Sequence, residues 1–391
     1  MSRLNPAALL ALWSLPLSMF LGSFAWSFVY VSLPFYVEKL STYDAIATLR
    51  WTGWILGISS LITVVTAPLS GRMAQGRDPK RAFVWVQGLQ GLGFFFMAAA
   101  RTLVELLLSR MLLGLMGAVS TFAFLIAGRR RGDVRREVAA IQSSMTLGQV
   151  LGPPVGAIAA ARIGFRMSFI VAGVLLGAAT VLVVWAVPAQ APVPAADARR
   201  GRTPVRELGI VCLLVTAASS QVFFLTAILP QVLPPLGIPP AATLEAGGLV
   251  LFVSGLATAV GSMATARWGD LMGEHRAVSW SLAASSILLA ALAGAGNVWV
   301  FTALRVLQML CIAPVFPLSV AAIAQGASAQ TIGIVNSARI GASFLGPVLA
   351  TTLLGWTPPA VVYLVLAATG LAVIPLVAGL RRRAALDGAG S

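Results

Sequence analysis

Long apolar runs, separated by short polar connectors, make up most of the chain. Twelve such runs lie at approximately Leu9–Val37, Trp51–Ser70, Ala82–Ala100, Leu103–Ala127, Val138–Ala161, Phe165–Val187, Leu208–Leu236, Ala246–Ala266, Ala277–Ala295, Val298–Ile323, Gly333–Leu354 and Pro359–Leu380. A helix needs about 20 apolar residues to cross a bilayer, so each run predicts one transmembrane helix. The pattern therefore predicts an all-α integral membrane protein with twelve spans.

The composition excludes a soluble protein and argues against an enzyme. Of the 391 residues, 58% are hydrophobic and 10% are charged, whereas a soluble domain is about one quarter charged. His275 is the one histidine, and Cys212 and Cys311 both lie in apolar runs. A membrane-embedded transferase would need convergent His, Asp, Ser or metal groups. We therefore expect no catalytic residues, no cofactor and no metal site.

The distribution of basic residues predicts the orientation in the membrane. Allocating the 27 Lys and Arg residues to alternating sides places 19 with the N-terminus, five on the opposite side and three inside spans. Because cytoplasmic loops are rich in Lys and Arg, both termini are predicted to be cytoplasmic, in a multi-pass protein of a bacterial-type inner membrane. Basic loops on the cytoplasmic side of a lipid bilayer thus account for the net charge of +15. No nucleic-acid partner is expected.

The second half of the chain repeats the first at an offset of 194 to 196 residues. Arg110 falls on Arg305 and Gly152-Pro153 on Gly346-Pro347, with further matches at Leu33-Pro34, Gly71-Arg72 and Gln142-Ser143. Repeats that begin on the same side of a membrane are related by an axis along its normal and hold a substrate site near the midplane. We expect an N-terminal six-helix bundle at 1–188, a cytoplasmic linker at 189–206, and a C-terminal six-helix bundle with a short cytoplasmic tail at 207–391.

The fifth predicted span carries a run of glycines and prolines at Gly148, Gly152, Pro153, Pro154 and Gly156. Glycines four apart let a neighbouring helix approach closely, and proline removes a helix hydrogen bond. Together with the doubled six-helix plan, this pattern resembles the antiporter signature of the major facilitator superfamily, in particular its twelve-span drug/proton antiporter-type exporters. The resemblance covers essentially the whole chain and implies export. From physics alone, a tight helix crossing with no role in transport direction is equally open.

Two further segments resemble the cytoplasmic gating loops of that superfamily. The first contains Gly71, Arg72, Asp78 and Arg81, with Gln75 where the family usually has aspartate, and the second contains Asp270, Gly273 and Arg276. A carboxylate and a guanidinium in such a loop can pair in one conformation and separate in the other, which makes a latch. Asp270 with Arg276 is the better latch candidate. The alternative is a basic loop that only fixes topology.

An arginine inside the fourth predicted span is the strongest candidate for a transport residue. Arg110 resembles the span-4 arginine motif of the superfamily, and a charge inside a bilayer usually faces a cavity or a partner. Arg305 is its repeat mate, and Arg339 is a third intramembrane cation. The residues expected to line a substrate cavity are Trp26, Tyr30, Arg110, Gln142, Gln149, Gln221, Gln308, Asn336 and Arg339. Hydrogen bonding between helices is the alternative for each polar residue among them.

All twelve carboxylates fall in connectors or at span ends. Exporters of cationic drugs often use a carboxylate in span 1, so its absence here favours a neutral or anionic cargo. Glu105 and Glu245 are the candidates for proton coupling, although each also fits an interfacial position. We therefore expect a monomeric secondary transporter that exports a small amphipathic drug or metabolite by alternating access, in exchange for protons. A lipid flippase and a sugar or siderophore exporter of the same fold are the alternatives.

Overall fold

The computed structural model describes residues 6–74, 78–117, 119–127, 134–189, 204–324 and 329–389. Within these ranges the chain is helical and contains no strand. The helices are α1 (Pro6–Tyr30), α2 (Leu33–Leu40), α3 (Ala45–Ala74), α4 (Pro79–Ala99), α5 (Leu103–Leu115), α6 (Val119–Ala127), α7 (Val134–Ile163), α8 (Phe165–Ala186), α9 (Val205–Val232), α10 (Thr243–Met263), α11 (Thr265–Met272), α12 (Glu274–Ala291), α13 (Val298–Ile312), α14 (Val315–Ala324), α15 (Ala329–Leu354) and α16 (Pro359–Ala389). Three short 3₁₀ turns lie at Pro234–Leu236, Pro240–Ala242 and Leu292–Gly294.

Every predicted apolar run contains at least one helix, so the all-α membrane class is confirmed. Among the described residues, ten helical segments are long and apolar enough to cross a membrane, and the bent pair Trp13–Tyr30 and Leu33–Leu40 makes an eleventh. The remaining predicted span, Val138–Ala161, coincides with α7, a 30-residue helix. This helix is not among the segments that are apolar enough to cross a membrane, because it begins with charged residues and contains glutamines.

Three predicted spans are each built from two helices. The first bends by 41° between α1 and α2, next to Pro34. The fourth is broken between α5 and α6, and the tenth between α13 and α14, beside Pro314. Proline has no N–H to donate and its ring collides with the preceding turn, which accounts for the breaks at Pro34 and Pro314.

Several predicted connectors are more helical than expected. Gly71 and Arg72 were expected in a loop, but α3 continues through them to Ala74. Asp270 lies on the short helix α11 instead of in a loop. In the first case α3 continues past the end of the apolar run, and in the second a separate short helix follows α10, which ends at Met263.

The predicted linker at 189–206 lies largely in a part of the chain that the structure does not describe. Its residues 190–203 lie outside the described residues, and α9 already begins at Val205. The C-terminal tail is also helical, since α16 extends to Ala389.

The chain divides into two compact units. The first unit comprises Met1–Thr42, Ile58–Asp197 and Gly247–Phe252; the second comprises Tyr43–Gly57, Ala198–Ala246 and Val253–Ser391. Each unit contains most of one sequence half and a short segment of the other. The domain boundaries at 188 and 207 stay a prediction.

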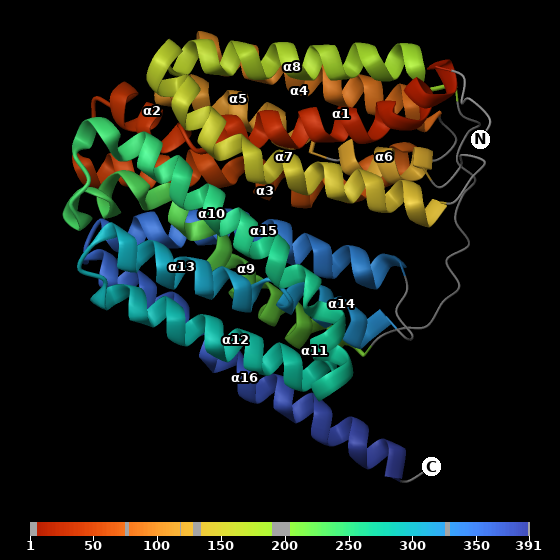
Figure 1. The fold of residues 1–391 in the computed structure, drawn as a ribbon, viewed down its shortest axis with the longest axis vertical. Helices are drawn as coiled ribbons and strands as arrows, with labels where there is room; N and C mark the ends of the chain where they lie inside the picture. The colour runs from red at the N-terminus through yellow and green to blue at the C-terminus, as the bar shows by residue number, and fades with distance from the viewer. Residues whose placement is uncertain are drawn as a thin grey trace. The chain divides into compact units, whose positions relative to one another are not determined.

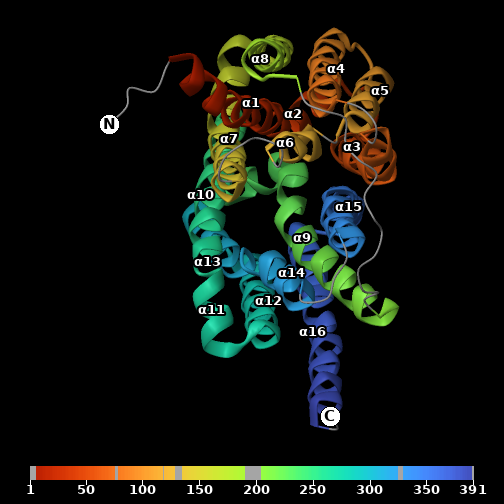
Figure 2. The same ribbon diagram turned by 90° about the vertical axis from the view of Figure 1, so that its right-hand side faces the viewer.

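In the first unit α1 packs along α7 and α8, and α4 packs along α8 (Figure 1). Figure 2, which shows these helices nearly end-on, places α1, α7 and α8 as direct neighbours. A buried apolar cluster fills the space between the helices and includes Leu15, Phe83, Phe122, Ile141 and Val183. Burial of such side chains and close backbone packing together hold the helices in register.

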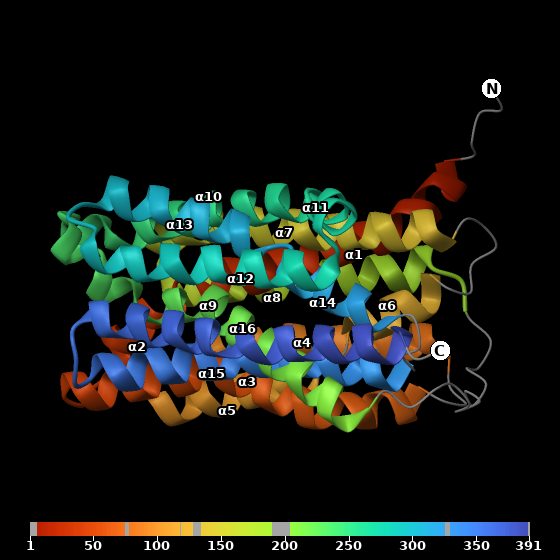
Figure 3. The same ribbon diagram turned by 90° about the horizontal axis from the view of Figure 1, so that it is seen from below.

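The second unit repeats this helix pairing. Here α9 packs along α15 and α12 along α16 (Figure 3), which are the pairs expected if the halves arose by duplication. The segment Tyr43–Gly57, which contains the first turns of α3, also belongs to this unit. A Cβ atom built on Gly57 would lie 2.9 Å from the Phe344 Cα, and one built on Gly53 would lie 3.1 Å from the Val348 Cα. At both glycines α3 therefore contacts α15 at backbone distance.

Candidate functional site

Arg110 lies in the interior of the first unit, on the last two turns of α5. It is 1% exposed, and its guanidinium carbon lies 5.1 Å from the ring centre of Trp26 and 5.8 Å from that of Tyr30. Trp26 and Tyr30 are one turn apart on α1, so both rings face the same neighbour. Aromatic faces attract a cation, and more strongly away from water. The predicted intramembrane arginine is thus placed beside two of its predicted cavity partners.

Gln90 on α4 fixes the orientation of the Trp26 ring. The Trp26 indole N–H donates to Gln90 Oε1 at 3.4 Å, and the Gln90 amide donates to the Met116 carbonyl at 2.7 Å. Phe94, one turn further along α4, contacts Trp26 edge to face at 5.7 Å. We call Trp26, Tyr30, Gln90 and Arg110 the arginine box. Sequence analysis missed Gln90, although a glutamine in an apolar run was a visible signal.

The backbone around Arg110 is held against α3. The Ser59 hydroxyl donates to the Arg110 carbonyl at 2.6 Å, and the Thr63 hydroxyl donates to the Gly114 carbonyl at 2.9 Å. A Cβ atom on Gly114 would lie 2.8 Å from the Ser59 Cα. The glycine that follows the span-4 arginine therefore allows α5 and α3 to pack closely, and this contact positions Arg110.

The repeat mate Arg305 is also 1% exposed, but its surroundings are polar. Its guanidinium donates to the carbonyls of Gln221 at 2.9 Å and Val222 at 2.8 Å, and to the side-chain oxygen of Gln308. The Phe224 ring centre lies 5.3 Å from the guanidinium carbon. Arg305 on α13 therefore binds directly to the backbone of α9.

A closed hydrogen-bond network extends from Arg305 through the second unit. Gln221 donates to Ser286 at 2.9 Å and to the Leu366 carbonyl at 3.1 Å, and accepts from Ser285 at 3.0 Å. Gln308 donates to Ser285 at 3.1 Å. Gln221 and Gln308 are both fully buried, so the structure places these two predicted cavity residues in helix-to-helix hydrogen bonds.

The two clusters occupy equivalent positions of the repeat. At the repeat offset of 195 residues, the positions of Trp26, Gln90 and Arg110 correspond to those of Gln221, Ser285 and Arg305. Three helices thus contribute the same three positions in each half, with different chemistry. In the first half two aromatic rings lie beside the arginine, and in the second half carbonyl and amide oxygens accept hydrogen bonds from it.

The other predicted cavity residues are distributed over both units. Gln142 and Gln149 are exposed on α7 in the first unit. In the second unit Asn336 is half-buried on α15, and Arg339 is exposed there with its guanidinium carbon 4.6 Å from the Phe316 ring centre. Their membership of one substrate cavity stays a prediction.

The glycines of the antiporter-like motif lie against the backbone of α1. A Cβ atom on Gly148 would lie 2.6 Å from the Phe20 carbonyl oxygen, one on Gly152 would lie 2.8 Å from the Phe28 amide nitrogen, and one on Gly156 would lie 2.7 Å from the Phe28 Cα. The Ser23 hydroxyl also donates to the Met145 carbonyl at 2.9 Å. Pro153 lies within this stretch of α7. The motif therefore forms a tight crossing of α7 and α1.

The predicted gating segments have clear local roles. Asp78 caps α4, since its carboxylate accepts from the Lys80 amide at 2.9 Å. Gly273 joins α11 to α12 with φ +77°, a conformation that favours glycine. Asp270, Arg276 and Arg81 are exposed, and no hydrogen bond or ion pair joins Asp270 to Arg276 in the described part of the chain. The surroundings of Gly71 and the side chain of Arg72 lie outside what the structure describes.

Glu105 and Glu245 both lie at the start of a helix. The Glu105 carboxylate accepts from the Arg101 amide at 2.6 Å, and the Thr102 hydroxyl accepts from the Glu105 amide at 3.2 Å. This pair is a variant of the capping box, in which the carboxylate accepts from the residue before the N-cap Thr102, and the Thr-x-x-Glu spacing could have predicted it. Glu245 is exposed in the first turn of α10. The described residues contain no group of three or more His, Cys, Asp or Glu that could hold a metal ion.

Comparison with known proteins identifies relatives over most of the chain. The profile of the Major Facilitator Superfamily matches residues 15–239 and 209–389. An uncharacterized MFS-type transporter, YuxJ of Bacillus subtilis (strain 168), is 27% identical over 337 residues, covering 83% of this chain and 85% of that protein. Multidrug resistance protein MdtG of Proteus mirabilis (strain HI4320) is 24% identical over 300 residues, or 74% of each chain. A crystallised mutant of the nucleoside transporter NupG has a TM-score of 0.78 at 13% identity, over 94% of this chain and 99% of that one.

Proposed function

This chain belongs to the Major Facilitator Superfamily, and from that premise we propose that it exports a small amphipathic drug or metabolite in exchange for protons. The family consists of membrane transporters, so a small-molecule substrate follows from membership. The direction of transport and its coupling to protons are our proposal. They are supported by the antiporter-like motif on α7 and by the similarity to MdtG, which is named as a multidrug resistance protein.

The arginine box is the observation that carries the proposed substrate class. A cation buried inside a span attracts an anionic or strongly polar group of a ligand, because water does not compete there. The Trp26 and Tyr30 rings offer flat apolar faces beside the same charge. We therefore propose a neutral or anionic amphipathic cargo that contacts Arg110 with its polar group and the two rings with its apolar part.

Arg305 is proposed to have a structural role. Its hydrogen bonds to Gln221, Val222 and Gln308 are all made within the protein. A ligand would have to displace these charge-assisted bonds, each worth about 1.5–3 kcal/mol. We therefore propose that Arg305 anchors α13 to α9 and does not contact the substrate.

The cellular arrangement is part of the same proposal. The excess of basic residues on one side supports cytoplasmic N- and C-termini in a bacterial inner membrane. Transport by a single copy through alternating access is proposed from the repeated architecture. Of the two proton-coupling candidates, the Glu105 carboxylate already accepts a capping hydrogen bond. Glu245, at the start of α10, is therefore the first residue to test for proton coupling.

The proposal is tested by flux from proteoliposomes under an imposed pH gradient. The panel contains cationic, neutral and anionic amphipathic compounds, and the protein is compared with its Arg110→Lys and Trp26→Leu variants. Arg162→Gln is the control, because it removes an exposed cation at the end of α7. We expect gradient-driven efflux of neutral or anionic compounds that falls at least tenfold in both box variants and is unchanged in the control.

Efflux of lipophilic cations alone would overturn the proposed substrate class while leaving export intact. Efflux that ignores the pH gradient would overturn proton coupling. Absence of flux with every compound, in protein that remains folded, would favour the alternative of lipid flipping, which is measured with fluorescent phospholipids in the same vesicles.

A further inference from the structure

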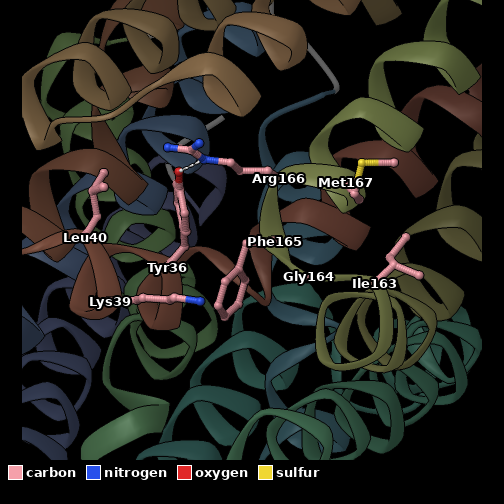
Figure 4. Close-up of a pocket in the computed structure, with 8 residues that line it drawn as sticks. All are labelled: Tyr36, Lys39, Leu40, Ile163, Gly164, Phe165, Arg166 and Met167. Atoms are coloured by element: carbon pink, nitrogen blue, oxygen red, sulfur yellow. Dashed lines mark hydrogen bonds between the residues drawn. The ribbon is translucent and has the colours of Figure 1, made fainter.

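A pocket of 380 Å³ lies in the first unit, at the ends of three spans and away from the arginine box. Its walls come from α2, from the end of α7 and from the start of α8 (Figure 4). The residues that line it are Tyr36, Lys39, Leu40, Ile163, Gly164, Phe165, Arg166 and Met167. Two of the eight are cations and none is a carboxylate, so the pocket has a net positive charge.

Arg166 is held in place by hydrogen bonds. Its Nε–H donates to the Tyr36 hydroxyl at 3.3 Å and its Nη2 donates to the Ala100 carbonyl at 3.1 Å. The Tyr36 hydroxyl in turn donates to the same carbonyl at 3.1 Å. Figure 4 shows the Arg166 guanidinium lying over the end of the Tyr36 side chain. A preordered guanidinium of this kind binds an anion at a lower entropic cost than a mobile one.

The second cation, Lys39, reaches the pocket along an aromatic face. Its ammonium nitrogen lies 5.9 Å from the Phe165 ring centre, and Figure 4 shows its side chain extending toward that ring. Phe165 begins α8, so the positive end of this 22-residue helix adds to the potential of the two cations.

The rim of the pocket is apolar. Ile163 and Met167 are each 49% exposed, and in Figure 4 their side chains point away from Tyr36 and Lys39. Both residues lie where predicted spans meet the polar connectors. At this level of a bilayer, lipid phosphates lie next to the start of the acyl chains. The pocket therefore combines positive charge with an apolar exit at the depth of the headgroups.

We propose that this pocket binds the headgroup of an anionic phospholipid. The phosphate would be held by Arg166 and Lys39, and the acyl chains would lie over Ile163 and Met167. The proposal does not depend on the transported substrate, because none of these residues belongs to the arginine box.

The chain offers an internal control for a direct test, since Lys39 and Lys80 are its only two lysines. Lys80 lies at the start of α4 and donates to the Val184 carbonyl at 2.9 Å, away from the pocket. The protein is placed in nanodiscs of phosphatidylcholine alone, or of phosphatidylcholine and phosphatidylglycerol in equal parts. Each lysine's rate of modification by an amine-reactive reagent is then measured by mass spectrometry.

We expect phosphatidylglycerol to slow the modification of Lys39 about fivefold relative to Lys80, the effect of roughly one charge contact at a membrane surface. Arg166→Gln should abolish this difference, whereas Arg162→Gln, with the same loss of charge next to the pocket, should keep it. Adding glycerol phosphate or inorganic phosphate to phosphatidylcholine nanodiscs should leave the Lys39 rate unchanged, because those anions lack acyl chains.

Three results would overturn the proposal. The first is equal slowing of Lys39 and Lys80, which would show only a general surface potential. The second is protection that Arg162→Gln removes as fully as Arg166→Gln does. The third is protection by free phosphate alone, which would indicate a soluble anion site. If Arg166→Gln does not fold, Lys39→Gln is tested by native mass spectrometry, where it should retain fewer phosphatidylglycerol molecules than the unaltered protein.

Discussion

Replacing Gly156 by alanine tests whether the glycine motif of α7 is a packing device. A Cβ atom at this position would lie 2.7 Å from both the Cα and the carbonyl carbon of Phe28 on α1. Ordinary contacts of a Cβ atom begin at about 3.4 Å, and the Phe28 carbonyl oxygen would lie closer still, so the deficit is at least 3.4 − 2.7 = 0.7 Å. The atoms in contact are backbone, and they cannot move aside by changing a rotamer. The helices must therefore separate or rotate along their shared length.

The expected cost follows from two opposing effects. Overpacking a well-packed interior destabilises by about 1–3 kcal/mol, whereas alanine is about 0.5–1 kcal/mol better than glycine inside a helix. Gly177 on α8 is a matched control, because a Cβ atom there meets nothing within 4 Å. Gly156→Ala should thus be less stable than Gly177→Ala by about 1–3 kcal/mol, the overpacking cost alone.

Thermal unfolding in detergent, followed by near-UV absorbance or by exposure of the free cysteines, measures both variants against the parent protein. Proton-gradient flux is measured on the same preparations at a temperature where both remain folded. Equal midpoints for Gly156→Ala and Gly177→Ala would refute the packing argument. A normal midpoint with lost flux in Gly156→Ala would instead assign the motif a direct role in transport.

Two further predictions concern charged residues. Arg305→Lys should lower stability by about 2–4 kcal/mol, because one ammonium cannot replace a planar guanidinium that donates to Gln221, Val222 and Gln308. Thermal unfolding compared with Arg339→Lys measures this, and equal midpoints would argue against the anchoring role. Glu105→Gln should keep the pH dependence of flux and change stability by only about 0.5 kcal/mol or less, because glutamine can still accept from the Arg101 amide. Loss of gradient-driven flux in Glu105→Gln would place the coupled proton on Glu105.

The helices could be predicted because a helix surrounded by lipid needs a long apolar run, which is visible in the sequence. A run such as Phe165–Val187 has to be helical to satisfy its backbone in a bilayer, and α8 covers it almost to the residue. Two other features carried weaker signals. The eight-residue helix α11 is too short and too polar to stand out. The segment Tyr43–Gly57 belongs to the second unit although it lies in the first half of the sequence. This assignment depends on contacts with residues far away in sequence.

Three of the four residues of the arginine box could be predicted from the sequence. Arg110, Trp26 and Tyr30 were visible as polar or aromatic residues inside spans, and the structure brings them together. The role of Gln90 depends on the rotation of α4 against α1, which no local pattern records. The difference between Arg110 and Arg305 was also hidden, because the partners of Arg305 are partly backbone carbonyls. Every residue has a backbone carbonyl, so residue types do not show which carbonyls accept a hydrogen bond from a buried side chain.

The contact of Gly53 and Gly57 with α15 has a consequence for biosynthesis. Phe344 follows Gly57 by 344 − 57 = 287 residues. At about 5–20 residues per second, a ribosome needs roughly 15–60 s to make the intervening chain. During that time the glycine face of α3 has been inserted without the helix that covers it in the finished protein. The second unit is therefore completed late in synthesis, and until α15 is made the glycine face of α3 is open to lipid.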